Sequence, residues 1–322
     1  MILAADVGGT KTNIALFSEG CYEPLRQASY PSRGAPDLET IVREFLKGGS
    51  EVPTRACFGI AGPILDQRCV TSNLPWIVDG PKIAAEFGFG GLRLINDLEA
   101  TAYGLSVLES SSLFTLNSGV PYPGHGALVA AGTGLGEAFL FWDGQTHRPG
   151  ACEGGHTDFG PRNQEQIALL QYLYGRYDHV SYERILSGPG LHNIYEFLRD
   201  SGRADEPADF AAGLPKDDPS PAISEAALRG HPEICVCALD LFVQIYGAEA
   251  GNLALKVMAT HGVYVAGGIA PKILEKLKDG TFLQAFRDKG RFRKLMDTFP
   301  VYVVLDDKTA LKGAAHFAQS CN

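Results

Sequence analysis

Two stretches of the chain share one pattern of apolar and polar positions. Residues 3–20 read LAADVGGTKTNIALFSEG and residues 127–144 read ALVAAGTGLGEAFLFWDG, and the two align without a gap. Each predicts a β-hairpin whose glycine-rich turn carries so few side chains that backbone amides can approach a bulky anion. Ordinary hairpins that use glycine only for its positive φ angles are the alternative. Two copies in one chain favour a duplicated fold with a phosphate ligand held between the halves.

The N-terminal third continues this hairpin into an α/β pattern. Apolar runs predict a third strand at residues 23–30 and further strands at residues 55–61 and 92–95. Helical periodicity and capping residues predict helices at residues 37–47, 81–87 and about 97–108, the first with Asp37 as its N-cap. The order of three strands and then alternating helices and strands indicates an open mixed sheet.

The second hairpin restarts this pattern, and helical insertions interrupt it between about residues 164 and 261. A strand at residues 263–266, a helix from Pro271, a strand at 301–305 and a helix at 308–318 complete the chain. Residues 110–124, rich in Ser, Gly and Pro, are interpreted as a domain boundary, and residues 204–221 as an exposed excursion. We expect two α/β domains with active-site residues at strand ends, in the cleft between the halves.

Composition narrows the classes of function. The chain has 322 residues, enough for two domains, with 45% hydrophobic and 20% charged residues, which is typical of a soluble globular protein. The net charge of −9 disfavours nucleic acid or an anionic membrane as the main partner. No signal peptide is expected, because Asp6 lies inside the first apolar run, and residues 234–258 are too polar for a membrane span. Seven scattered cysteines indicate a cytoplasmic protein, and the pair Cys235 and Cys237 is interpreted as core thiols rather than a zinc site.

Candidate chemistry follows the first strand of each hairpin. Asp6 can hold Mg²⁺ directly or through water while the next amides bind phosphate oxygens, or it only satisfies the turn amides. The turn Gly132-Thr133-Gly134 has no carboxylate and can donate only amides. The pair Gly267-Gly268, after a later strand, could cover a flat nucleoside or reflect close packing, and the sequence leaves both open.

Further polar residues suit a hydroxylated substrate. Asn96-Asp97 lies where a strand meets a helix, so Asp97 is by position a helix N-cap, or else a base that accepts a hydroxyl proton. Glu153 and His156 flank a Gly-Gly bend, an arrangement typical of a polyol clamp more than of a metal site. Glu183 precedes a glycine-rich turn and, from its position alone, is interpreted as a solvated helix residue.

Seven ordered motifs, over essentially the whole chain, resemble the bacterial-type ATP-dependent glucokinases of the sugar kinase, actin and Hsp70 ATPase superfamily. They are DVGGT, GIAGP, IND, GTGLG, EGGHTDFGP, ERILSGPGL and VAGGI. The resemblance implies an α/β protein with two RNase-H-like domains and the active site in the interdomain cleft. The small domain would span residues 1–109, completed by 302–322, and the large α+β domain residues 110–301. The resemblance also implies a cytoplasmic homodimer that phosphorylates D-glucose at the 6-hydroxyl with Mg-ATP.

The resemblance also assigns roles to residues. Asp97 would be the catalytic base, and the sugar would be bound by Asn96, Asp97, Glu153, His156 and Glu183. ATP would be bound by Ala5, Asp6, Val7, Gly8, Gly9, Thr10, Gly132, Thr133, Gly134, Gly267 and Gly268, with Asp6 holding Mg²⁺ through water. The related ROK kinases carry a cysteine-rich zinc motif after their histidine. Here no cysteine lies between Cys152 and Cys235, so His156 is expected to contact sugar. Lys11 could face solvent or phosphate.

Three other functions compete with this one. A kinase for another hexose or an amino sugar is the nearest. A non-catalytic sugar-sensing regulator is disfavoured because Asp97 is intact and the first hairpin begins at residue 3, which leaves no room for a DNA-binding domain. A chaperone-type ATPase is disfavoured because no peptide-binding domain is expected after the ATPase.

Overall fold

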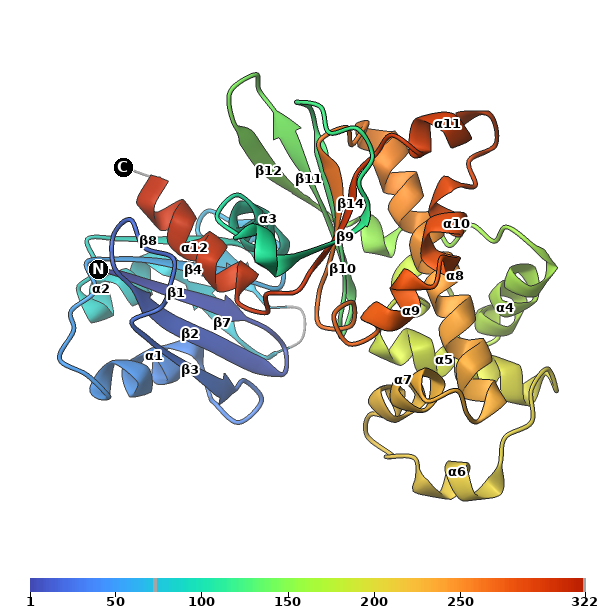
Figure 1. The fold of residues 1–322 in the computed structure, drawn as a ribbon. Coiled ribbons are helices and arrows are strands. Elements are labelled where there is room, and N and C mark those ends of the chain that lie inside the picture. The colour runs from blue at the N-terminus through green and yellow to red at the C-terminus, as the bar shows by residue number, and fades with distance from the viewer. Residues whose placement is uncertain (72–73, 321–322) are drawn as a thin grey trace. The chain divides into compact units, whose positions relative to one another are not determined.

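The computed structural model describes residues 1–71 and 74–320, which divide into two compact units. Unit 1 comprises residues 1–112, 148–151 and the chain from residue 306 onward, and unit 2 comprises residues 113–147 and 152–305. Each unit contains a mixed β-sheet flanked by helices (Figure 1).

The sheet of unit 1 has the strand order β3-β2-β1-β4-β8. Strand β1 (Ile2–Val7) pairs antiparallel with β2 (Lys11–Phe17), which pairs with β3 (Arg26–Pro31). Strands β4 (Arg55–Ile60) and β8 (Gly91–Asn96) are parallel to β1. This arrangement confirms the open mixed sheet and the first hairpin that the sequence predicts.

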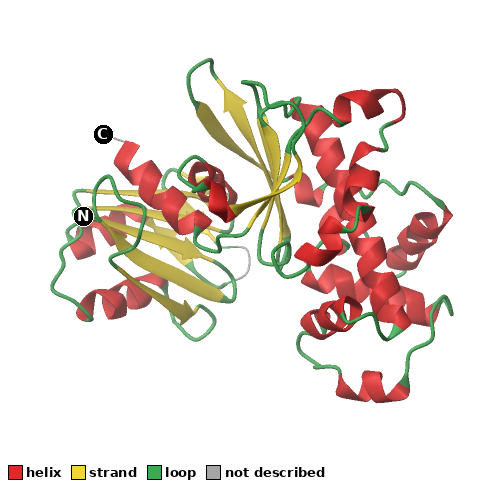
Figure 2. Ribbon diagram, in the orientation of Figure 1, coloured by secondary structure: helices red, strands yellow, loops and turns green. Residues whose placement is uncertain are grey.

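Helices cover both faces of this sheet because successive side chains of a strand point to opposite faces. Leu3 and Ala5 pack with residues of α1 (Leu38–Lys47) and α2 (Gly80–Phe87). Ile2 and Ala4 pack with residues of α3 (Asp97–Leu105) and α12 (Thr309–Ser320). The separation of helices and strands is clear in Figure 2. A second sheet of very short strands, β5 (Ile64–Leu65), β6 (Arg68–Val70) and β7 (Ile77–Asp79), was not expected, because such strands carry too few residues to show a periodicity.

The second sheet, whose strands belong to unit 2 except for residues 148–151 of β12, repeats the strand order of the first as β12-β11-β10-β13-β14 and adds β9 at the edge. Its strands are β9 (Leu113–Asn117), β10 (Gly126–Ala131), β11 (Leu135–Trp142), β12 (His147–Cys152), β13 (Gly262–Ala266) and β14 (Val301–Val304). Strands β10 and β11 form the second hairpin, and β13 is parallel to β10 as β4 is to β1. The duplication inferred from the repeated hairpin therefore extends to five strands.

Two predictions about this sheet need correction. Residues 302–305 were expected to join the small domain, but Val303 pairs with Val265 of β13 and with Phe114 of β9. The duplication explains this, because β14 holds the place in the second sheet that β8 holds in the first, and only α12 joins unit 1. Residues 113–117, which lie within the expected domain boundary at residues 110–124, form the edge strand β9. Neighbouring Ser, Gly and Pro residues obscure this short apolar stretch in the sequence.

The two hairpins also differ by one residue in register. Val7 pairs with Thr12 in the first hairpin, whereas Ala131 pairs with Leu135 in the second. The first turn is therefore one residue longer than the second. The gapless alignment holds for the strands before the turns but is displaced by one residue after them, so aligned side chains in β2 and β11 face opposite sides of their sheets.

The rest of unit 2 is helical and surrounds α8 (Glu233–Val257). The other helices are α4 (Gln164–Tyr174), α5 (Gly188–Asp200), α6 (Ala208–Gly213), α7 (Ser220–Leu228), α9 (Leu274–Lys278), α10 (Thr281–Arg287) and α11 (Arg293–Met296). Helix α8 is long and apolar enough to cross a membrane, but 78% of its most apolar window is buried inside the protein. It is the core helix that the sequence predicts. Helix α6, within the expected excursion, has no buried residue.

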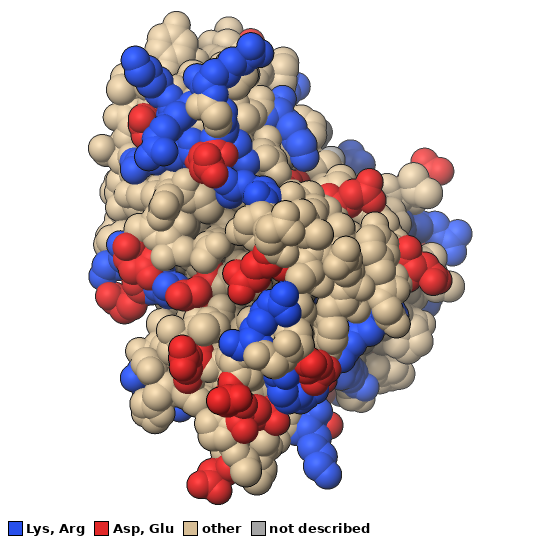
Figure 3. All heavy atoms as spheres, turned by 90° about the vertical axis from the view of Figure 1, so that its right-hand side faces the viewer, with Lys and Arg blue, Asp and Glu red and all other residues tan. Residues whose placement is uncertain are grey.

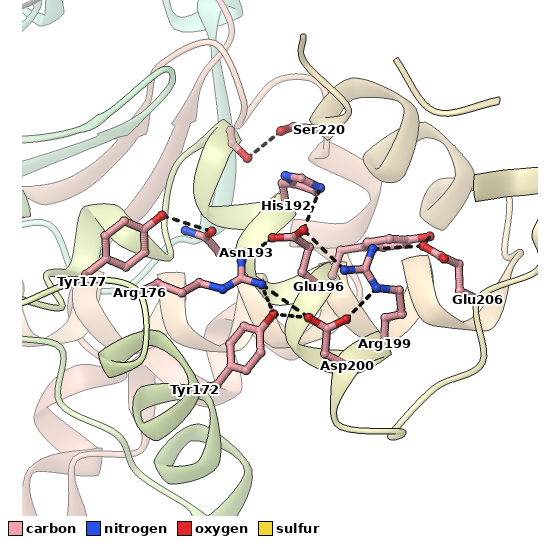
Figure 4. A network of polar contacts seen from close by, with 12 residues as sticks. Tyr172, Arg176, Tyr177, His192, Asn193, Glu196, Arg199, Asp200, Glu206 and Ser220 are labelled. Atoms are coloured by element: carbon pink, nitrogen blue, oxygen red, sulfur yellow. Dashed lines mark hydrogen bonds and ion pairs between the residues drawn. The ribbon is translucent and has the colours of Figure 1, made fainter. Parts of the chain in front are cut away.

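A network of polar contacts ties α5 to α4 and to the segment that follows α5 (Figure 4). The Tyr172 hydroxyl donates to Asp200 at 2.6 Å, and Arg199 Nε donates to the same carboxylate at 2.7 Å. Arg176 pairs with Glu196 one turn earlier on α5. Exposed ion pairs contribute little singly, but a connected network of them fixes a helix in place. Figure 3 shows a cluster of Lys and Arg at the top of the face it displays, and Lys and Arg mixed with Asp and Glu over the rest of that face.

Candidate active site

In unit 1, candidate residues gather at the carboxyl ends of three parallel strands. Asp6 of β1 pairs with Gly59 of β4, and the next residue of β4, Ile60, pairs with Asn96 of β8. Asp6 and Asn96 therefore flank β4 at one edge of the sheet. Gly59 allows α3 to approach, because a Cβ there would lie 2.8 Å from the Ala100 Cβ. Ligands of open α/β sheets bind at this edge.

The first glycine turn is held by its carbonyl groups. The Gly8 N–H donates to the Lys11 carbonyl at 3.1 Å. Ser32 donates its hydroxyl to the Gly8 carbonyl at 2.7 Å and its N–H to the Thr10 carbonyl at 2.9 Å. Within the described residues, the N–H groups of Gly9 and Thr10 make no hydrogen bond. Ser32 was missed by the sequence analysis, because it follows a predicted strand and belongs to no motif.

The Asp6 carboxyl lies beside this turn. Burial raises its pKa above the ordinary value, while a hydrogen bond from Asn13 Nδ2 at 3.4 Å and the charge of Lys11 lower it. The carboxyl accepts no hydrogen bond from a turn amide among the described residues, so the interpretation that it only satisfies the turn amides is wrong. Lys11 itself is exposed.

Asn96, and not Asp97, caps helix α3. The Asn96 Oδ1 accepts from the N–H of Leu98 at 2.9 Å and of Glu99 at 3.3 Å. Asp97 is the first helical residue, and its Oδ1 also accepts from Leu98 N–H, at 3.0 Å. The interpretation of Asp97 as the N-cap is therefore wrong by one position. Because Asn96 supplies the cap, the Asp97 carboxylate at the helix N-terminus is not required for it.

The second glycine turn is anchored to helix α5. Its Gly132 N–H bonds to the Gly134 carbonyl at 2.8 Å, and its Gly132 carbonyl accepts from the N–H of Gly188 at 2.8 Å. The Thr133 and Gly134 N–H groups, like those of the first turn, make no hydrogen bond within the part of the chain described. The first residue of α5 therefore anchors this turn.

Gly267 packs directly against strand β10. Its φ is +84°, and a Cβ there would lie 2.9 Å from the carbonyl carbon of Ala131, just before the second glycine turn. Ile269 N–H donates to the same Ala131 carbonyl at 3.2 Å. Close packing therefore accounts for Gly267. Gly268 differs, because nothing lies within 4 Å of a Cβ built on it, so this residue leaves open space.

Three candidate sugar-binding residues converge in unit 2. Glu183 lies in the short helix η3 (Tyr182–Arg184), and its Oε2 accepts from the Leu135 N–H at 3.0 Å, at the end of the second glycine turn. His156 Nδ1 lies 3.9 Å from Glu183 Oε1, and His156 Nε2 lies 3.8 Å from Glu153 Oε2. Glu183 is thus no solvated helix residue. It joins an acid–imidazole–acid row whose members also face solvent.

The Gly-Gly bend between Glu153 and His156 rests on strand β11. A Cβ on Gly155 would lie 2.9 Å from the Leu135 carbonyl carbon, and one on Gly154 would lie 2.7 Å from the carboxyl carbon of Glu137. Both positions therefore need glycine for a close approach. Among the described residues, no group of three or more His, Cys, Asp or Glu side chains is arranged to hold a metal ion.

Comparisons with known proteins agree on one family. A family model described as glucokinase matches residues 3–321. The glucokinase of Nostoc punctiforme is 42% identical over 334 residues, which cover 98% of each chain. The crystal structure of a glucokinase from an Antarctic psychrotroph superposes with a TM-score of 0.83 at 30% identity, covering 98% of each chain. A ROK family glucokinase from Streptomyces griseus, solved with glucose and AMPPNP, shares the fold with a TM-score of 0.69 at 22% identity, covering 99% of each chain.

Proposed function

We propose, from the premise that this chain belongs to the glucokinase family, that it transfers the γ-phosphoryl group of ATP to the 6-hydroxyl of D-glucose. The members of this family are sugar kinases. The fold of this chain is the one that glucokinases and ROK kinases share. The observation that carries the proposal lies within unit 2. There the row of Glu153, His156 and Glu183 is joined to the second glycine turn through the Glu183–Leu135 hydrogen bond.

A row of hydrogen-bonding side chains next to a phosphate-binding turn suits a sugar that is being phosphorylated. Two carboxylates and an imidazole can accept and donate hydrogen bonds to vicinal hydroxyls. The neighbouring N–H groups of Thr133 and Gly134 make no hydrogen bond to the described residues and can bind anionic oxygens. An epimer that misplaces one hydroxyl leaves a carboxylate unpaired, at a cost of about 1–3 kcal/mol for each lost partner. Hydrogen bonds between this row and the sugar hydroxyls would therefore favour one hexose over its epimers.

Asp97 would accept the proton of the attacking hydroxyl, and Asn96 would bind the sugar beside it. Asn96 is held rigidly by its capping bonds to α3, and Asp97 follows it directly. Phosphoryl transfer asks little covalent chemistry of a protein, so its work is to position the reactants and stabilise charge. A positioned base adds roughly 10²–10⁴-fold in rate.

Asp6 fits a magnesium-dependent kinase. Its carboxyl is raised in pKa by burial and, among the described residues, accepts only the long hydrogen bond from Asn13, so a divalent cation nearby would stabilise its charged form. Bound Mg²⁺ would neutralise charge on the phosphates of ATP. Asp6 would hold it through water, while Gly8, Gly9 and Thr10 and the flanking Ala5 and Val7 would line the phosphates. Gly267 and Gly268 would border the nucleoside.

The same proposal includes a cytoplasmic homodimer, which follows from the family resemblance. Its mass of 34.5 kDa per chain makes the assembly testable by light scattering after size exclusion. A mass of one chain would contradict the dimer and leave the activity proposal untouched.

The decisive experiment compares wild type with D97A in a coupled assay with ATP and glucose. D97A is expected to lose at least about 10²-fold in kcat while still binding glucose in calorimetry. The control is D217A, a change at an exposed loop position of unit 2, which is expected to behave as wild type. Turnover of D97A near the wild-type rate would refute the base assignment.

The substrate range is tested in the same assay. Glucose is compared with mannose, fructose and N-acetyl amino sugars. A preference for an amino sugar would favour the nearest alternative. Glucose binding without turnover in the wild type would favour a sugar-sensing regulator.

A further inference from the structure

Two glutamate side chains are buried together behind the candidate sugar site. Glu137 lies on β11 and is 1% exposed, and Glu249 lies on α8 and is 0% exposed. The two carboxyl groups are hydrogen-bonded to each other. Two carboxylates cannot share a hydrogen bond, so one of the pair must carry a proton. Glu137 directly follows the GTGLG motif in the repeated stretch 127–144, but the sequence assigned no role to it or to Glu249.

The surroundings assign the proton to Glu137. Glu249 Oε2 accepts from Asn252 Nδ2 at 2.8 Å, the Tyr182 hydroxyl also bonds to Glu249, and Lys256 Nζ lies 3.6 Å from Glu249 Oε1. Within the described residues, Glu137 Oε1 and Glu249 Oε1 both lack a hydrogen-bond partner, but only the Glu249 oxygen has a lysine ammonium group as an ion-pair partner. A negative charge is therefore better accommodated on Glu249, and Glu137 is the neutral acid that donates to it.

Both members of the pair contact segments that carry sugar-binding candidates. Gly154 lies against the Glu137 carboxyl, and the Cys152 thiol donates to the Glu137 backbone carbonyl at 3.5 Å, so Glu137 supports the loop of Glu153 and His156. On the other side, Tyr182 directly precedes Glu183.

A backbone bond joins the two segments. The Tyr182 N–H donates to the Thr157 carbonyl at 3.1 Å, one residue after His156. The glutamate pair and this backbone bond therefore connect both sides of the acid–imidazole–acid row.

We propose that the hydrogen-bonded pair of Glu137 and Glu249, holding a single proton, is a positioning unit that sets the sugar-binding geometry of Glu153, His156 and Glu183. The inference rests on the proposed function and adds to it two residues that do not touch the sugar. When the proton leaves Glu137, two negative charges face each other in the interior. The Gly154 bend and the Tyr182 turn then move apart, and sugar binding weakens.

The burial of the pair and the charges around it place the loss of the Glu137 proton near physiological pH. Burial, followed by the charge of Glu249, raises the pKa of Glu137 to about 8, while Lys256 lowers it. Lys289, which donates to Asn252 at 2.5 Å and to the Ala248 carbonyl at 2.8 Å, has its pKa lowered by burial to about 8. The other titratable groups facing the pair are Cys152 and Tyr182, together with Tyr246, whose pKa values burial raises.

The expected change in the KM for glucose follows from the fraction of molecules in which Glu137 keeps its proton. If only the protonated pair binds sugar well, apparent affinity scales with that fraction. With a midpoint near pH 8, the KM for glucose rises about 10-fold between pH 7 and pH 9. The KM for ATP is expected to change less, because the pair reaches the second glycine turn through Glu183 and has no hydrogen bond of its own to that turn among the described residues.

The test measures both KM values from pH 6 to 9 for wild type, E137Q, E249Q and the exposed control E225Q. Glutamine keeps the shape of Glu137 and its donor, so E137Q is expected to bind glucose as well as wild type at pH 7, with a KM that no longer depends on pH. E249Q removes the charge that helps to raise the Glu137 pKa, so its KM rise shifts to lower pH. E225Q follows wild type. Calorimetric glucose binding at pH 7 and 9 gives the same comparison without turnover.

The outcomes separate the two proposals. No turnover of glucose by the wild type would overturn the proposed function, whatever the variants do. Turnover with a KM rise that persists in E137Q would overturn the positioning unit and assign the titration to another group, such as Lys289. A wild-type KM for glucose that does not change with pH would overturn it as well. If E137Q is poorly folded by circular dichroism, the E249Q midpoint decides, and an unshifted midpoint refutes the proposal.

Discussion

Replacing Gly155 by alanine tests how closely the sugar loop must rest on strand β11. The new Cβ would lie 2.9 Å from the carbonyl carbon of Leu135 and 3.1 Å from its Cβ. Favourable carbon–carbon contacts need about 3.5–4.0 Å. Leu135 is 5% exposed and paired with Ala131 in the hairpin, so the strand cannot yield. The carbonyl oxygen of Leu135 would lie closer still, so the loop must instead move outward by at least roughly 1 Å.

This displacement has two measurable consequences. Overpacking of this kind costs about 1–3 kcal/mol of stability. A shift of about 1 Å in a positioning loop can cost up to roughly 10²-fold in kcat/KM. We expect the loss of kcat/KM for glucose in G155A to approach this limit, because Glu153 and His156 flank the bend. The KM for ATP should change less, because the clash reaches the second glycine turn through Leu135.

The measurement combines the coupled assay with thermal unfolding. The control is G213A at the end of α6, where nothing lies within 4 Å of a new Cβ and φ is not positive. It is expected to keep full activity and gain about 0.4–1 kcal/mol, because alanine restricts the unfolded chain. Wild-type glucose kinetics in G155A would refute the argument that this contact positions the loop.

Three further predictions concern buried charges. D6N is expected to unfold at a higher temperature than wild type at pH 7, because burial raises the pKa of Asp6 and a neutral amide avoids the cost of burying the charge. Its KM for Mg-ATP is expected to rise. A lower unfolding temperature would show that the Asp6 charge is well compensated. For Glu137, whose pKa rises from 4.5 to about 8 on folding, stability is greatest at low pH and falls as pH rises through this range, at up to about 1.4 kcal/mol per pH unit. Urea titrations of wild type against E137Q measure that slope, and equal slopes would contradict it. K312M removes the 3.0 Å ion pair of the 8% exposed Lys312 with Asp306, and its urea unfolding free energy should fall by about 3–5 kcal/mol; a loss under about 1 kcal/mol would mean that solvent replaces the pair.

Much of the fold follows from local patterns in the sequence. The apolar run from Ile2 to Val7 and the glycine-rich turn after it sufficed to predict the first hairpin, and the repeat at residues 127–144 sufficed to predict the duplication. Helix α1 was predictable from its cap, because Asp37 accepts from the N–H of Thr40 at 2.8 Å. These features depend on neighbours in sequence, where periodicity and capping act.

Other features depend on partners distant in sequence. The one-residue difference between the two turns leaves no trace in a gapless alignment, because both turns consist of permissive residues. The place of β14 depends on pairing with β13 and β9, and the latter precedes β14 by more than 180 residues. The role of Asn96 as the cap of α3 depends on where β8 ends, which sequence patterns fix only to within a few residues.

The candidate site divides in the same way. The sequence alone pointed to the residues that we propose carry the chemistry, because Asp97, Glu153, His156 and Glu183 stand in ordered motifs with glycine turns beside them. Only the tertiary structure decided what supports them. Glu137 looks like one polar residue in an apolar strand until α8 brings Glu249 against it, and the burial of both is what forces a shared proton. A motif records which side chains react, whereas the cost of burying a charge depends on which distant groups surround it.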